Sequence, residues 1–329
     1  MNHSTHAIEG LKRYSQGLMK AGEVEDALAV ANIISLIHSG TKFLLPENGD
    51  VGVAVHDSDM MALVRPPYPV TVFEWSNDMS MPLDPDGAFK KAGVPEDKLI
   101  TSAKRIAIVV DNKEVARLIG MPTEGQKDGF IIFSVYHFTK DDLWSVVPIG
   151  VGLGPDTEIE SFTTEGGETR TSFMGNVIRI MPGSIEYMTQ MSGSDDKAIE
   201  IMLSDVANEV TVAVNALACL NAKNVKSVTI EAPAKLNAKR VKNGKTPFFE
   251  YKVLDIFLGD KVRQVQSGSG KRIRMALDEI MKSSTKLCAV RGHFKRRKSG
   301  LFWWNMHMRG HQRNGVVEKD YSVRIQDGQ

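Results

Sequence analysis

Apolar residues recur at three- and four-residue steps near the N-terminus, which predicts an amphipathic helix. This helix spans about residues 24–37, with acidic residues in its first turn and Ser39-Gly40 after its end. A thinner apolar stripe that includes Leu11 and Leu18 predicts a preceding helix over about residues 8–20. The two helices are expected to pack together as a hairpin.

The longest helical pattern covers Asp196 to Asn221. Its apolar residues keep helical spacing for about six turns, and its several alanines permit close packing. Asp205 and Glu209 interrupt the apolar stretch. We therefore expect the core helix of a globular domain and no membrane span.

Runs of β-branched and aromatic residues predict strands at residues 70–75, 105–110, 129–137, 143–151, 227–231 and 248–257. Residues 156–179 are rich in Thr, Glu and Gly and predict a surface loop or hairpin. A basic loop is expected at residues 235–245, and three short strands are expected within residues 286–329. The fold class is therefore α+β, with a helical N-terminal hairpin, a mixed sheet with a long core helix, and a basic, mostly-β C-terminal part.

Charge divides the chain more sharply than hydropathy does. Residues 1–233 carry 19 Lys and Arg against 32 Asp and Glu, a net charge of −13, whereas residues 234–329 carry 22 against 8, a net charge of +14. We expect an acidic α+β domain over residues 1–225 and a basic domain over residues 226–329. Such asymmetry favours a nucleic acid or another polyanion as partner of the basic part, and leaves a protein partner open for the acidic part.

The only cysteines are Cys219 and Cys288, and the N-terminal residues lack the apolar core of a secretory signal. This composition is typical of a reducing compartment, so a cytoplasmic location is expected, in the host if the protein is viral. Asn243-Gly244-Lys245-Thr246 is similar to the end of a phosphate-binding loop, but Lys239 stands where that loop needs a glycine. No cofactor is expected.

Cations are interleaved with aromatic residues between positions 290 and 311, which is the composition of a surface that tracks phosphates and stacks on bases. The candidate nucleic-acid contacts are Lys239, Arg240, Lys242, Lys245, Arg291, Arg296, Arg297, Lys298, Trp303 and Arg309. The alternative is a small hairpin with solvated cations and with Phe294, Phe302 and Trp304 packed inward. Both descriptions place Trp303 on the face opposite Trp304.

Three histidines in this basic stretch, His293, His307 and His311, could act as general acid and base in phosphodiester cleavage beside neighbouring arginines. Cys288 and the same histidines follow the spacing C-x₄-H-x₁₃-H-x₃-H, and thiolate and imidazole are zinc ligands. The second thiolate of a typical small zinc module is missing, and the first two residues are five apart on an expected strand. We therefore expect no metal.

Several C-terminal elements occur together: Arg291-Gly292-His293-Phe294, Trp304, His307, Arg309-Gly310 and Val316-Val317-Glu318-Lys319-Asp320-Tyr321. This segment resembles a C-terminal segment of uncharacterised bacteriophage and plasmid proteins. The resemblance implies a mobile-element setting and no particular activity. The sequence as a whole predicts a phage or mobile-element protein whose basic part contacts nucleic acid. A phosphodiester-cleaving enzyme and a protein-binding structural or host-inhibitory protein are the alternatives.

Overall fold

The computed structural model describes residues 2–51, 54–55, 58–61, 64–78, 102–118, 122, 128–163, 169–223, 225–256, 286–290, 293–297, 300–304, 307–309 and 311–316. The chain divides into two compact units, one of residues 1–221 and 225–255 and one of residues 222–224 and 256–329. The end of the long helix and the change in charge after it predicted a division near residue 225. In the division by contacts, residues 226–255 lie in the first unit, because their strands extend its sheet.

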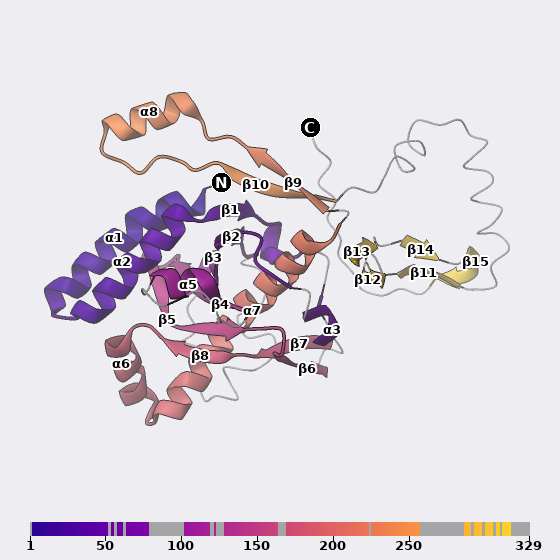
Figure 1. The fold of residues 1–329 in the computed structure, drawn as a ribbon, viewed down its shortest axis with the longest axis horizontal. Coiled ribbons are helices and arrows are strands. Elements are labelled where there is room, and N and C mark those ends of the chain that lie inside the picture. The colour runs from indigo at the N-terminus through magenta and orange to yellow at the C-terminus, as the bar shows by residue number, and fades with distance from the viewer. Residues whose placement is uncertain are drawn as a thin grey trace. The chain divides into compact units, whose positions relative to one another are not determined.

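An eight-stranded mixed sheet forms the centre of the first unit (Figure 1). Its strands lie in the order β8-β5-β4-β3-β2-β1-β10-β9. Their bounds are β1 Thr41–Leu44, β2 Val70–Ser76, β3 Ser102–Asp111, β4 Phe130–Phe138, β5 Leu143–Leu153, β8 Asn176–Arg179, β9 Val225–Ile230 and β10 Tyr251–Ile256. β1 runs parallel to β2 and β10, and the pairs from β2 through β5 to β8 are antiparallel.

Helices cover both faces of this sheet. The α1 (His3–Ala21) and α2 (Val24–Ser39) hairpin packs on the face that carries Ile106, Ile108 and Val110 of β3. The long helix α7 (Asp195–Asn221) lies on the other face, where its Glu209 meets Arg105 of β3. A strand covered on both sides has few exposed positions, and β4 is buried from Phe130 to His137.

Two contacts fix α1 against the sheet. The buried carboxylate of Glu74, on β2, accepts hydrogen bonds from the backbone N–H groups of His3 (2.7 Å) and Ser4 (3.2 Å) at the start of the helix. At Gly10 the helix approaches Trp144 of β5 so closely that an added Cβ would lie 2.5 Å from the indole. Both contacts fix how far along the sheet the helix sits.

The remaining elements surround this centre. They are the short helices η1 Glu47–Gly49, α3 Ser58–Met61 and α5 Asn112–Leu118, the hairpin of β6 Glu158–Thr163 and β7 Thr169–Met174, and the helices α6 Pro182–Ser192 and α8 Ala234–Lys242. In the second unit the described strands are β11 Lys286–Val290, β12 His293–Arg297, β13 Gly300–Trp304, β14 His307–Arg309 and β15 His311–Val316. β14-β11-β15 form one small sheet and β12-β13 another.

The α+β class, the N-terminal helical hairpin, the mixed sheet and the long core helix are confirmed. Residues 156–179 contain a hairpin, one of the two structures expected there. One prediction was wrong in detail. Residues 235–245 are largely the helix α8, because Pro233 precedes a run of good helix formers. The bounds of β13 and β15 include Gly300 and residues 312–315, which were expected between strands. The mostly-β character of the C-terminal part stays a prediction.

Among the described residues, α7 alone is long and apolar enough to cross a membrane by length and composition. Core helices of soluble proteins meet the same criterion, and twelve residues of α7 are buried within the protein. The helix thus has the packing expected of a core element.

Candidate nucleic-acid interface

The first unit has a basic surface on the segment of residues 225–252, called here the basic arm. It runs through β9, α8 and the start of β10 and carries seven Lys and Arg against two Glu, a net charge of +5. α8 lies beyond the ends of β9 and β10 (Figure 1). None of the residues of α8 is buried.

Local sequence accounts for the ends of α8. Pro233 occupies the N-cap position, where its missing N–H leaves no donor unsatisfied. The last turn contains Lys239, Arg240 and Lys242, whose charges suit the negative end of the helix dipole. Gly244, with φ of 66°, then turns the chain back.

The helix has two polar faces with different contacts. Lys235, Lys239 and Lys242 are exposed and lie at positions i, i+4 and i+7, so they form one stripe, called here the lysine face. Asn237 and Arg240 lie on the opposite side. Asn237 exchanges two hydrogen bonds with the backbone of Phe248, at 2.8 Å and 2.7 Å.

Arg240 is an internal contact of the fold. Its Nε donates to the carbonyl of Thr246 at 2.7 Å, its Nη2 lies 2.7 Å from Oε1 of Glu9 on α1, and its guanidinium lies 4.3 Å from the ring centre of Phe248. The side chain is only 13% exposed. Its predicted role as a phosphate contact therefore competes with an existing ion pair, whereas Lys239, Lys242 and Lys245 are exposed.

The other predicted site residues lie in the second unit, where the backbone register of the strands is described. Arg296 and Arg297 lie on β12, Trp303 on β13 and Arg309 on β14. Arg291 and Lys298 lie outside the described residues. The nucleic-acid role of all six stays a prediction.

The small three-stranded sheet brings together some of the predicted zinc ligands. Cys288 pairs with Arg309, Val290 with His307, and Lys286 with His311. Residues paired across strands share a face, so Cys288, His307, Arg309 and His311 share one by register. His293 lies on β12 in the other small sheet. The four predicted ligands are therefore divided between two sheets, and no metal-binding cluster occurs among the described side chains.

The β12–β13 hairpin has a described backbone register. Phe294 pairs with Trp303, while Phe302 pairs with Lys295 and Trp304 with His293. The inward packing of Phe294, Phe302 and Trp304 stays a prediction. The placement of Trp303 and Trp304 on opposite faces agrees with this register.

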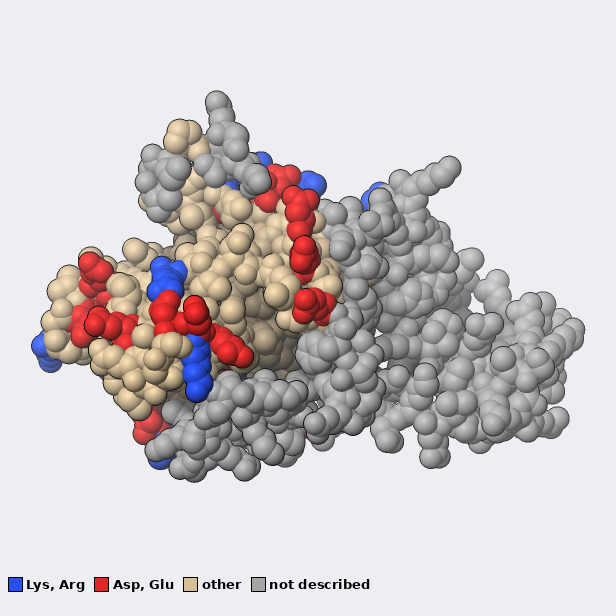
Figure 2. All heavy atoms as spheres, turned by 90° about the horizontal axis from the view of Figure 1, so that it is seen from below, with Lys and Arg blue, Asp and Glu red and all other residues tan. Residues whose placement is uncertain are grey.

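Acidic residues occupy a different part of the first unit. Figure 2 shows more acidic than basic side chains among the described residues on the face that it draws. Exposed carboxylates occur on β6, α6 and α7, at Glu158, Glu186, Asp196 and Glu200. A protein partner for this acidic surface stays a prediction.

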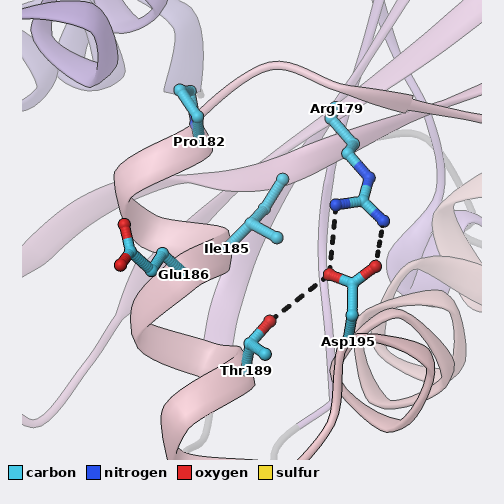
Figure 3. A pocket seen from close by; sticks show the side chains of 6 residues that line it. All are labelled: Arg179, Pro182, Ile185, Glu186, Thr189 and Asp195. Carbon is cyan, nitrogen blue, oxygen red and sulfur yellow. Dashed lines mark hydrogen bonds and ion pairs between the residues drawn. The ribbon is translucent and has the colours of Figure 1, made fainter.

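A shallow pocket of about 250 Å³ opens between β8, α6 and the start of α7 (Figure 3). It is lined by Arg179, Pro182, Ile185, Glu186, Thr189 and Asp195. Arg179 and Asp195 form a doubly hydrogen-bonded ion pair across it, and the hydroxyl of Thr189 lies 3.4 Å from the same carboxylate. None of the predicted site residues is among those that line the pocket, and its Arg179 and Asp195 are already paired with each other.

One polar network lies inside the core and was not predicted. Glu209 of α7 is fully buried, 2.9 Å from Nη1 of Arg105, and accepts a 2.6 Å hydrogen bond from the hydroxyl of Tyr136. Burial raises the pKa of Asp205 to about 7; the nearby Arg105 charge lowers it and the Glu209 carboxylate raises it, both by less than burial does. The carboxylates of Asp205 and Glu209 lie one helical turn apart in α7, which was the signal available in the sequence.

These observations define an α+β protein with a helix-covered mixed sheet and a projecting basic arm. Comparisons with protein-family models, with curated proteins and with solved structures found no match. The geometry of the basic arm is therefore the main structural basis for a functional proposal.

Proposed function

We propose that this is a phage or mobile-element protein whose basic C-terminal part contacts nucleic acid, and that the lysine face of α8 provides phosphate contacts. The single observation that carries the proposal is the arrangement of α8. Asn237 and Arg240 bind one side of the helix to the fold, while three lysines are exposed together on the other. The mobile-element setting is supported by the C-terminal resemblance.

The dimensions of the lysine face suit a phosphate backbone. Lys235 and Lys242 are seven residues apart, which corresponds to about 10 Å along a helix. Duplex DNA carries about six phosphates over that length of its axis, so three flexible ammonium groups can each reach one. Lysine side chains act as point charges and read no bases, so the contact is independent of base sequence.

The test uses the full chain with labelled duplex DNA, single-stranded DNA and RNA. Lys235→Gln/Lys239→Gln/Lys242→Gln should weaken binding and reduce the log–log salt slope by about 2.7 for duplex DNA, since each phosphate contact contributes about 0.9. Such a slope corresponds to about 40-fold between 50 and 200 mM salt. The same loss of charge at three scattered exposed lysines, in Lys20→Gln/Lys140→Gln/Lys197→Gln, is the control.

Two outcomes contradict the proposal. Absence of binding by the parent protein at 50 mM salt and micromolar concentration would remove nucleic acid as a partner. Equal losses in the two triple variants would mean that net charge acts without a defined lysine face.

Phosphodiester cleavage is the second candidate, favoured by the strand order of the three-stranded sheet. His307 and Arg309 lie on β14 and His311 on β15, the two strands that flank β11, so two general acid–base groups and a cation for the phosphorane charge occur in one small sheet. Cleavage of labelled DNA or RNA, with and without Mg²⁺, measures this activity. Full activity in His293→Ala/His307→Ala/His311→Ala would exclude all three histidines.

A further inference from the structure

The first turns of α1 bind the chain segment that returns from α8. Asn2 Nδ2 donates to the carbonyl of Phe249 at 2.8 Å, and Thr5 Oγ1 donates to that of Pro247 at 3.0 Å. Glu9 accepts from the N–H of Thr246 at 3.1 Å. Positions 2, 5 and 9 lie on one side of the helix, so α1 holds residues 246–249 along its length.

Glu9 is the point where this contact reaches α8 itself. Its Oε1 accepts hydrogen bonds from both the guanidinium of Arg240 and the backbone N–H of Thr246. The carboxylate thereby joins the outgoing helix of the basic arm to the returning segment. Because Glu74 and Gly10 fix α1 on the sheet, Glu9 connects the direction of α8 to the core.

We infer that Glu9 is a positioning residue for the nucleic-acid interface, holding the side of α8 opposite the lysine face. This inference rests on the proposed function. It goes beyond that function by assigning a role in polyanion binding to an acidic residue of the acidic part of the chain. Electrostatics alone gives the opposite expectation, since removing a negative charge near a basic surface should strengthen the binding of a polyanion.

Two substitutions with the same net charge separate these expectations. Glu9→Ala removes both accepted hydrogen bonds, whereas Glu9→Gln keeps an acceptor oxygen and loses only the charge. Positioning predicts that Glu9→Ala binds nucleic acid roughly tenfold more weakly than the parent, with Glu9→Gln in between. Net charge alone predicts that both variants bind equally and at least as tightly as the parent. Glu200→Ala, at an exposed site on α7, is the control for charge.

Hydrogen exchange of the full chain provides a readout that does not depend on any ligand. The amides of residues 235–246 should exchange faster in Glu9→Ala than in Glu9→Gln or the parent, while those of β3 and β4 stay protected. Unchanged exchange in residues 235–246 would overturn the positioning role. If the parent binds nucleic acid and the lysine-face variant does not, tight binding by Glu9→Ala would overturn the positioning role of Glu9 but not the proposed function. Failure of the parent to bind would instead overturn the proposed function.

Discussion

The helices α7 and α8 are held in place by different kinds of contact. α7 buries twelve of its residues against the sheet and its neighbours, whereas α8 buries none and is held by hydrogen bonds and one ion pair to α1 and residues 246–248. Apolar burial contributes about 25 cal/mol for each Å² removed from water, whereas a hydrogen bond at a surface contributes on the order of 1 kcal/mol. Because α8 is held by such polar contacts, we expect that it can detach from the fold without global unfolding of the protein.

The largest expected effect tests this difference directly. Trp75 on β2 is fully buried, and its indole N–H donates to Asn77 at 3.0 Å. Trp75→Ala should reduce the free energy of unfolding by about 3–5 kcal/mol, because it leaves a large cavity in the core of the first unit. Arg240→Ala should instead leave the global transition almost unchanged and increase proteolysis within residues 235–246. Chemical denaturation and limited proteolysis measure the two effects, and a cooperative loss of the whole fold in Arg240→Ala would break the comparison.

A second contrast applies within the hairpin β12–β13, whose register puts Trp303 and Trp304 on opposite faces. The sequence predicts that Trp304 is packed and that Trp303 stacks on a base. Trp304→Ala should cost about 3–5 kcal/mol in the stability of the C-terminal part, and Trp303→Ala should fold normally but bind nucleic acid more weakly. Thermal melting and binding titrations distinguish them. Two variants that melt and bind as the parent does would show that neither tryptophan has its predicted role.

The smallest expected effect concerns the polar network within the core. Burial raises the pKa of Asp205 from 3.8 to about 7, so this carboxyl stays protonated up to a higher pH in the folded state than in the unfolded state. Asp205 therefore lowers stability as pH rises from about 4 to 7, with little further change above 7. Asp205→Asn should be more stable than the parent at pH 8 and close to it at pH 4. A stability difference that is constant over this range would contradict the shifted pKa.

The sequence by itself determined the elements whose side chains alternate or repeat regularly. Helical spacing predicted α1, α2 and α7 to within a few residues, and β-branched runs predicted β2 to β5. These predictions worked because a core needs one apolar face per helix and continuous apolar strands where both faces of a sheet are covered. The shorter elements β1, β8 and α6 were missed, since four to eleven residues carry little periodic signal.

Only the tertiary structure decided how the candidate site is arranged. Charge counting identified the lysines of the basic arm but treated Arg240 as equivalent to them, and Lys235 was not among the candidate contacts chosen from it. The fold separates these residues, because Glu9, 231 positions earlier, pairs with Arg240 and leaves the lysine face exposed. Glu209 of α7 is also paired only by the fold, because its partners Arg105 and Tyr136 come from the strands β3 and β4. Composition records which charges a chain has, whereas the pairing of strands and helices decides which of them remain available to a partner.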